Sequence, residues 1–341
     1  FKQKTAYEIM PSLVGSEMCI RDRYFEYLRD EIPKIFEQYE KWCGPYPYAQ
    51  FTIVDSYLGR GGGMEYPQLV LIRVKGGRDK LPSFKPMMRV SLIDVLAHET
   101  DHQWFYGVLA NNEIDEPWLD EGFATYTEGR YMELRFPPDS MKKIAGPLSL
   151  FGFDRYNSVS FMDLGLYLAQ NSPWKEPVLG MKAYQMKNYG SIVYGKGRRV
   201  LEMLSFIVGD STMDEIMKEY YHYYSFHHPT TEDFKRVAER ISGKDLDWFF
   251  NDWLRSTKCA DFSVGAIKTD EKGVRLEVIQ KGDIDMPVDV LLRDKEGNEV
   301  QKVLQRGKRV LYFPGIKKVS LVGIDPEDRI PETDEWNNFH P

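Results

Sequence analysis

The chain has few histidines, few cysteines and no long apolar run. Its 341 residues include six histidines and three cysteines. No apolar run is long enough to cross a membrane, and the cysteines form neither a CxxC pair nor a disulfide framework. The formal charge of −7 comes without a basic stripe, which is a poor basis for binding nucleic acid. We therefore expect neither a transmembrane segment nor a nucleic-acid partner.

Length and composition are those of an ordinary globular protein. The chain is 42% hydrophobic and 28% charged, and it is long enough for two domains. Residues 1–23 stand apart, because they resemble translated sequencing-adapter read-through and are poorly patterned for a helix or a strand. We expect this segment to be non-native and the native sequence to begin near Tyr24; a genuine N-terminal segment is the alternative.

Two cysteines remain once the first segment is set aside. Cys43 and Cys259 lie far apart in the sequence. A single bridge between them is left open, and so is the redox compartment. The sequence does not fix the cellular location; it favours an extracytoplasmic over a cytoplasmic one.

The segment from His98 to His102, which reads HETDH, is the most informative stretch of the chain. Two histidines four residues apart on a helix point the same way, because a helix turns once per 3.6 residues. Their ring nitrogens can therefore grip one metal ion. Glu99 lies beside the first ligand and can accept a proton from a metal-activated water.

A third ligand follows at the expected spacing. Glu121 lies within the segment WLDEGF on the next predicted helix and completes a His₂Glu set, which leaves one zinc position open for water. The HExxHxxGxxH pattern with a third histidine is absent, since Phe105 and Val108 occupy those positions. The site is thus of the gluzincin kind, with one zinc ion per chain. A chance HExxH on a solvated helix is the alternative.

Apolar spacing and turn residues predict that the first half of the chain contains both helices and strands. Ser91 and Asp94 form a capping box that should open the metal-binding helix, which we expect to run to about Leu109. Pro117 should start the helix that carries Glu121. The other expected elements are a helix over 24–42, strands over 51–57 and 68–74, a glycine-rich bend over 59–63, and short helices or loops over 141–180.

Helices dominate the next part, and strands follow. Arg198–Val208 should be a helix ending at Gly209. Two further helices should be capped by Thr212 with Glu215 and by Thr230 with Asp233. After Cys259 the period changes to two, which predicts a small antiparallel β domain. A short apolar-faced helix over 246–254 should precede this domain. Within the domain we expect a turn over 295–298, strands over 309–313 and 319–324, and buried alternate positions at Val274, Leu276, Val278, Val288 and Val290.

Four motifs that occur together give the chain a resemblance to a known family. HETDHQWF, WLDEGFATY, GGGMEYP (Gly61 to Pro67) and VYGKG (Val193 to Gly197) occur together between about Gln50 and Leu254. This combination resembles the zinc aminopeptidase family that includes alanyl and leucyl aminopeptidases and leukotriene hydrolase. The resemblance implies an α+β fold, in which a thermolysin-like catalytic domain over 24–257 is followed by an antiparallel β-sandwich over 258–341. As departures from the family, we expect the family's N-terminal β domain to be absent here, and also the large C-terminal helical domain of many members.

The resemblance also assigns roles. In the family the glutamate of a G-x-M-E-N strand binds the free α-amine of the substrate, and Glu65 matches it after Gly62, Gly63 and Met64. The family's tyrosine before Lys-Gly stabilises the oxyanion, and Tyr194 matches it. Physics supports both roles, because a carboxylate pairs with an ammonium and a phenol donates to a developing oxyanion. The alternatives are a solvated edge-strand acid for Glu65, a plain hairpin turn for the glycines and a core aromatic for Tyr194.

Several positions depart from the family pattern or carry less weight. Tyr66 and Asp120 stand where the family usually has Asn, and Asp101 adds an acid beside His102 that either faces solvent or tunes the metal. Tyr189 is a weaker candidate for catalysis than Tyr194 and is more typical of a core residue. The remaining histidines show no ligand spacing and read as ordinary residues: His222, His227, His228 and His340.

The leading hypothesis is a zinc aminopeptidase acting on peptides with a free N-terminus. Glu99 would act as general base and then acid. An endopeptidase with the same metal chemistry is a rival, which the amine-binding Glu65 argues against. A catalytically silent binding scaffold is a second rival, and intact ligands and base disfavour it. Zinc content and turnover of an aminoacyl anilide separate the three.

Overall fold

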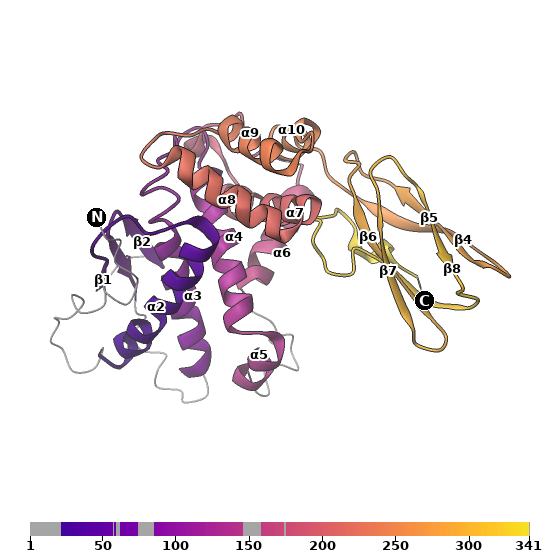
Figure 1. Ribbon diagram of the computed structural model, residues 1–341, viewed down its shortest axis with the longest axis horizontal. Coiled ribbons are helices and arrows are strands. Elements are labelled where there is room, and N and C mark those ends of the chain that lie inside the picture. Colours follow the sequence, from indigo (N-terminus) through magenta and orange to yellow (C-terminus); the bar gives the residue numbers. More distant parts are fainter. Residues whose placement is uncertain are drawn as a thin grey trace.

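The chain has a mainly helical part that is followed by a part built mainly of strands. The computed structural model describes residues 22–56, 58, 62–73, 85–145, 158–173 and 175–340. A helical part, residues 22–254, is followed by a β part, residues 260–340, and the two lie side by side (Figure 1). The fold is therefore of the α+β class. Most of the segment expected to be non-native, residues 1–21, lies outside the described residues.

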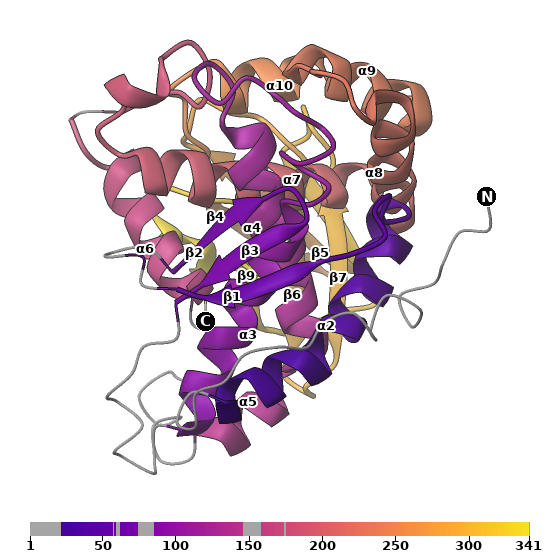
Figure 2. The same cartoon turned by 90° about the vertical axis from the view of Figure 1, so that its left-hand side faces the viewer.

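The helical part begins with a helix and a small mixed sheet. Strand β3 pairs in parallel with β1 and antiparallel with β2, so that β2 lies at an edge. Figure 2 shows this sheet lying over the helices that follow it. The predicted helix over 24–42 is confirmed, and the two predicted strands are present but shorter; Tyr57, Val74 and most of the glycine-rich bend lie outside the described residues. The elements are α2 (Asp22–Cys43), β1 (Thr52–Asp55), β2 (Gly63–Tyr66) and β3 (Leu69–Ile72).

Helix α4 (Trp118–Arg135) packs against α3 (Lys85–Asp101) and α7 (Gly197–Val208). Phe123 of α4 lies against Phe234 at 4.9 Å and Phe105 at 4.7 Å between ring centroids, so an aromatic cluster fixes this helix. No helix among the described residues combines the length and apolarity needed to cross a membrane. The helices are α3 (Lys85–Asp101), α4 (Trp118–Arg135), α5 (Pro138–Ala145), α6 (Ser158–Gln170), α7 (Gly197–Val208), α8 (Asp210–Tyr224), α9 (Thr231–Ser242) and α10 (Asp247–Leu254), with the short 3₁₀ turn η5 (Ala183–Gln185) and the π-helical segment η6 (Gly190–Lys196).

Both predicted ends of the metal-binding helix are wrong. Helix α3 begins at Lys85, so Ser91 lies inside it, and Asp94 is half-buried and interacts with Glu128 instead of capping a terminus. The helix ends at Asp101, and the chain continues in turns that are closed by other backbone hydrogen bonds, with Tyr106 at a φ of 101°. These turns still bury Trp104, Phe105 and Val108, so the apolar spacing continues where the helix does not.

Of the other two predicted helix caps, one is confirmed and one is wrong. Thr230 caps α9 and forms a capping box with Asp233, as predicted. The predicted cap at Thr212 is wrong, because Gly209, with a φ of 93°, ends α7 and α8 begins directly at Asp210. The predicted helices over 198–208 and 246–254 are confirmed, and α5 and α6 are the short helices expected over the described portions of 141–180.

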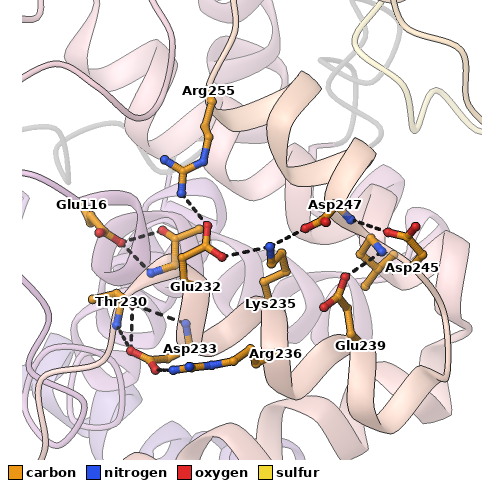
Figure 3. A network of polar contacts seen from close by, with 12 residues as sticks. Glu116, Thr230, Glu232, Asp233, Lys235, Arg236, Glu239, Asp245, Asp247 and Arg255 are labelled. Atoms are coloured by element: carbon orange, nitrogen blue, oxygen red, sulfur yellow. Dashed lines mark hydrogen bonds and ion pairs between the residues drawn. The ribbon is translucent and has the colours of Figure 1, made fainter.

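The start of α4 is tied to the start of α9. Glu116 accepts hydrogen bonds from the backbone nitrogen of Thr231 at 2.6 Å and from its hydroxyl at 2.7 Å. Trp118 donates its indole N–H to the same hydroxyl at 2.9 Å. Figure 3 shows Glu116 at the edge of a larger polar network that continues through Glu232 to Arg255. The loop before Glu121 is therefore held at a fixed place.

The β part contains two antiparallel sheets, one of order β10-β9-β6-β7 and one of order β4-β5-β8. The predicted alternation is confirmed, since Val274, Leu276 and Val278 are buried on β5. The predicted turn joins β6 and β7, with Gly297 at a φ of 90°. The strands are β4 (Phe262–Asp270), β5 (Gly273–Gln280), β6 (Val288–Asp294), β7 (Glu299–Leu304), β8 (Val310–Pro314), β9 (Val319–Ile324) and β10 (Phe339–His340). The short 3₁₀ turn η7 (Glu335–Asn338) lies between β9 and β10.

Arg199 joins the two parts of the molecule. Its guanidinium donates to Asp163 of α6 at 2.9 Å and contacts the side chain of Asp328, in the loop after β9, at 3.3 Å. Asp328 itself takes a φ of 52°, a conformation that is uncommon outside glycine. The arginine side chain is buried. The β part thus contacts α7, the helix that follows the VYGKG motif.

Glu332 should make the β part lose stability as the pH rises. Burial raises its pKa from the ordinary 4.5 to about 8, even though it accepts a hydrogen bond from the Phe262 nitrogen at 2.6 Å. The folded state therefore holds a proton that the unfolded state releases between these values. Stability from this group is complete below pH about 4.5 and falls by roughly 1.4 kcal/mol per pH unit as the pH rises toward 8.

Glu332→Gln should remove this slope. Asn338 now donates to Glu332 at 2.9 Å, and its own Oδ1 has no partner among the described residues. A flipped Asn338 amide can therefore accept from the new glutamine. We expect the urea midpoint of the variant to rise relative to the parent between pH 5 and 8. The exposed Glu271→Gln is the control, and parallel pH profiles of parent and Glu332→Gln would contradict the assignment.

Candidate active site

Three side chains predicted as metal ligands meet at one point. His98 lies in the last turn of α3, His102 lies just beyond its end, and Glu121 lies in the first turn of α4. His98 Nε2 is 3.2 Å and His102 Nε2 is 3.5 Å from the same oxygen, Glu121 Oε2. The spacing argument therefore holds even though α3 ends one residue before His102. This oxygen and the two nitrogens form a candidate three-ligand metal site.

A carboxylate orients each histidine from behind. Glu128 Oε2 lies 3.1 Å from His98 Nδ1, and Asp120 Oδ1 contacts His102 Nδ1. A neutral ring that donates from Nδ1 has only a lone pair at Nε2. Both lone pairs then face the Glu121 carboxylate, and an arrangement of three acceptors around one point is stabilised by a cation.

Each of these carboxylates has a second carboxyl group behind it. Asp94, one turn before His98 on α3, is hydrogen-bonded to Glu128, and burial, together with the nearby Glu128, raises the pKa of Asp94. Glu113 is hydrogen-bonded to Asp120, and burial raises the pKa of Glu113 to about 9. Two carboxyl–carboxylate–histidine chains therefore support the two rings. The departure of Asp120 from the family's Asn belongs to the second of these chains.

Glu99 lies beside the three ligands with one oxygen free. The side chain is buried, and Oε2 has no hydrogen-bond partner among the described residues. Burial raises the pKa of Glu99 to about 7, against the opposing effect of His98. A carboxylate with a free oxygen in this place can accept a proton from a molecule bound at the three ligands.

Gly63 makes room for Glu99. A Cβ built on Gly63 would lie 2.2 Å from Glu99 Oε1 and 2.3 Å from its Cδ. Any larger residue would therefore displace the carboxylate. The glycine is needed here for contact with a side chain, in addition to the close backbone approach expected from the sequence.

Glu65 is brought to the same place by strand β2. Its carboxylate lies within 4.8 Å of ligand atoms of Glu99 and His102. Residues alternate along a strand, so Gly63 and Glu65 share the face toward α3, while Met64 and Tyr66 share the other. Because β2 is an edge strand, its second edge is open to an extended chain. Gly62 continues the pairing, since its carbonyl accepts from the Arg73 nitrogen at 2.9 Å.

Tyr194 reaches the site from η6. Its hydroxyl donates to Glu121 Oε1, the oxygen that does not face the histidines, and its ring stacks on His98 at 5.9 Å between centroids. Burial raises the pKa of Tyr194, so the hydroxyl stays protonated. The π-helical segment η6 spans seven residues; π-helices are rare and are frequently found at functional sites. The ring of Tyr189 lies edge-on to that of Tyr194, at 6.1 Å between centroids.

Two glycines set the separation of α4 and the Tyr194 segment. A Cβ on Gly122 would lie 3.1 Å from Gly197 Cα, and one on Gly197 would lie 3.0 Å from Gly122 Cα. Both contacts are with backbone, so neither neighbour has a side chain that can move aside. Glu121 and Tyr194, which bond each other, lie next to this crossing.

Gly122→Ala and Gly197→Ala should each lower the free energy of unfolding by roughly 1–3 kcal/mol, the usual cost of overpacking a core. Gly190→Ala is the matched control in η6, because a Cβ there meets no atom within 4 Å. Urea unfolding of the three variants measures the effect. A Gly122→Ala protein as stable as Gly190→Ala would contradict the close crossing.

Other sequence candidates lie outside the centre. Asp101 does not face solvent, because it is fully buried near Tyr39, and burial raises its pKa well above the usual range. Tyr66 is partly exposed, and its backbone carbonyl accepts from Gln103 at 3.1 Å. Among the described residues none of the other histidines joins a candidate metal group. Cys43 and Cys259 are free thiols, so no bridge joins them.

Sequence reasoning missed the residues behind the histidines. Glu128 follows Glu121 by seven residues, two turns along α4, and so shares its face. Asp94 precedes His98 by four residues and shares its face on α3. These spacings were available as signals for both. Glu113 had no such signal, because it lies in a loop whose path the sequence does not define.

Comparison with known proteins agrees with this geometry. The profile of the Peptidase family M1 domain matches residues 27–253. A protein described as probable aminopeptidase 2 from Sulfurisphaera tokodaii is 24% identical over 242 residues, which are 67% of this chain and 28% of that protein. Aminopeptidase B from Homo sapiens is 26% identical over 260 residues, which are 70% of this chain and 37% of that protein.

A solved structure has a similar fold. The crystal structure of Legionella pneumophila aminopeptidase A in complex with aspartic acid matches with a TM-score of 0.67 at 18% identity, over 91% of this chain and 34% of that chain. The chain thus spans only about a quarter to a third of the length of such relatives. Because the family profile covers well over half of the chain and includes every ligand candidate, the chain belongs to peptidase family M1.

Proposed function

We propose that this chain is the catalytic part of a zinc-dependent aminopeptidase that removes N-terminal residues from peptides. The observation that carries the proposal is the convergence of His98 Nε2 and His102 Nε2 on Glu121 Oε2, at 3.2 and 3.5 Å. Glu99 and Glu65 lie within 4.8 Å of a ligand atom of His102, and Tyr194 is hydrogen-bonded to Glu121. The names of the relatives, which are aminopeptidases, support the same activity.

The residues present fit a zinc ion. Two imidazole nitrogens and one carboxylate are the donors of catalytic zinc sites with an open position. Glu128 and Asp120 hold the far side of each ring, as the outer partners of zinc-bound histidines do. When bound, the ion polarises the substrate carbonyl and lowers the pKa of a water molecule to roughly 7.

Glu99 would serve first as general base and then as general acid. Its free Oε2 can accept a proton from the attacking water, and the same oxygen can deliver that proton to the leaving amine. Gly63 supports this role because it leaves space for the carboxylate at the point where the strand passes. Tyr194 would donate its hydroxyl hydrogen to the oxyanion of the tetrahedral intermediate.

Glu65 would select the free N-terminus. Its carboxylate lies on the ligand side of an edge strand, so a peptide that pairs with β2 would bring its ammonium group to Glu65. An internal peptide segment has no ammonium to offer, which supports the aminopeptidase over an endopeptidase. Intact ligands and base support an enzyme over a silent scaffold.

The domain organisation is part of the proposal. A thermolysin-like catalytic domain over 24–257 accounts for helices α3 and α4 contributing the ligands and for the sheet lying over them. The two antiparallel sheets that follow would pack as a β-sandwich over 258–341. Contacts of Arg199 with Asp328 would hold this domain against α7.

Metal removal tests the proposal directly. We expect one zinc ion per chain by metal analysis, loss of aminoacyl-anilide turnover with a chelator, and recovery with zinc. Glu121→Gln should lower zinc occupancy markedly, because it removes the anionic ligand that faces both histidines. Glu133→Gln, an exposed change on the same helix, is the control. Full occupancy in Glu121→Gln would refute the ligand assignment.

A further inference from the structure

Cys259 lies among amines where the chain passes from α10 into β4. Its side chain is buried, with 6% of the residue exposed. The Nζ atom of Lys175, in the segment after α6, lies 3.6 Å from the Cys259 sulfur. Lys175 is exposed, so the cluster reaches solvent on that side. The proposed peptidase mechanism uses neither residue.

A second lysine lies in the same cluster and is buried. Only 2% of Lys196 is exposed, and its charge interactions are with Cys259 and Lys175. In the part of the chain that the structure describes, no carboxylate lies within ion-pair distance of its amine, which lies 5.9 Å from the centroid of the Trp253 ring. Burial lowers the pKa of Lys196 to about 8. Buried lysines are nearly always paired with an acid, so this amine instead creates positive surroundings for the thiol.

The other buried cysteine provides a contrast. Cys43 is fully buried, and its charged neighbours are of both signs, the acids Asp101 and Asp214 and the bases Arg130 and Lys218. Burial raises the pKa of the Cys43 thiol well above its usual range. Reactive cysteines lie in electropositive, partly accessible surroundings, whereas buried structural ones are inert. Cys259 has an exposed lysine against its sulfur, whereas Cys43 is fully buried among charges of both signs.

We propose that Cys259 and Lys175 form a modification site that a hydroperoxide converts into a covalent sulfur–nitrogen link. In the first step the thiol attacks hydrogen peroxide, the O–O bond breaks, and sulfenic acid and one water form. In the second step Lys175 Nζ attacks the sulfur, the S–O bond breaks, and the oxygen leaves as a second water. The protein loses two hydrogen atoms, and the peroxide is reduced to two waters. A thiol reductant reverses the link.

The link would join two distant parts of the chain. Lys175 and Cys259 are 84 residues apart, and Cys259 directly precedes the strands of the β part. Closing so long a loop restricts the unfolded chain. The oxidised protein should therefore unfold at a higher urea concentration than the reduced protein. This effect is independent of zinc and of peptide hydrolysis.

Peptide mapping tests the proposal. The full chain is treated with hydrogen peroxide, digested with trypsin and analysed by mass spectrometry with and without dithiothreitol. We expect trypsin to skip Lys175, so that peptide 156–182 appears linked to peptide 259–268 with two hydrogen atoms fewer than their sum. The species should disappear with dithiothreitol. Omitting peroxide should leave Lys175 open to trypsin, so that peptides 156–175 and 259–268 appear separately.

Three variants make the test specific. Lys175→Arg keeps the positive charge but removes the amine nucleophile, so the link should be lost and dimedone should trap the sulfenic acid on Cys259. Cys259→Ser should lose both products, and Cys43→Ser should form the link like the parent. A link that persists in Lys175→Arg, or oxidation of Cys43 at the rate of Cys259 in the folded protein, would overturn the proposal. The outcome does not depend on the proposed peptidase activity, because no step uses the metal or the substrate.

Discussion

Replacing Glu99 with glutamine is expected to leave zinc bound and to lower kcat by roughly a hundred- to ten-thousand-fold, the range that general acid–base catalysis contributes. Glu99 lies beside the ligands but is not one of the three that converge on the site. Glutamine has nearly the same shape and fits against Gly63, where a Cβ would already collide. The substitution therefore removes the proton acceptor and little else.

The measurement is turnover of an aminoacyl anilide beside metal analysis of the same preparation. Glu37→Gln, an exposed change on α2, should match the parent in both. Because an interaction needed only in the transition state affects kcat and kcat/KM equally, KM should change little. Near-parental turnover of the loaded Glu99→Gln protein would show that another group accepts the proton.

The metal ligands could be predicted from spacing because spacing decides which helix face a side chain occupies. His98 and His102 lie on one face, and Glu121 meets both within 3.5 Å. The limits of α3 could not be predicted in the same way. Trp104, Phe105 and Val108 are buried by turns after the helix, and burial alone gives the same apolar spacing that a longer helix would give.

Polar residues were misinterpreted where a local pattern had a distant partner. Ser91 and Asp94 have the spacing of a capping box, yet Asp94 interacts with Glu128, which lies on α4. Asp101 likewise gave no sign of the buried place that it occupies near Tyr39. Such partners come from the packing of α3 against α4 and α2. The sequence of one helix carries no information about the residue that faces it across a contact.

The largest effect on substrate choice should come from Glu65. Its carboxylate lies within 4.8 Å of ligand atoms of Glu99 and His102, at the side of the site where β2 is open. If it pairs with the substrate's ammonium, an N-acetylated peptide should be a very poor substrate, because acetylation removes the charge and adds bulk. Glu65→Ala should lower kcat/KM for free-amine peptides by roughly 2–4 kcal/mol, the scale of truncating one partner of a desolvated charge pair.

The ratio of the two substrates separates recognition from general damage. Glu65 is close enough to Glu99 that its loss could disturb the base, and such a disturbance would slow both peptides equally. Loss of ammonium recognition would slow only the free-amine peptide and narrow its advantage over the acetylated one. Parallel measurement of the pair for parent, Glu65→Ala and Glu65→Gln therefore gives a result that a misplaced base cannot imitate. Equal cleavage of free and acetylated peptides by the parent would reject the aminopeptidase and favour an endopeptidase with the same zinc chemistry.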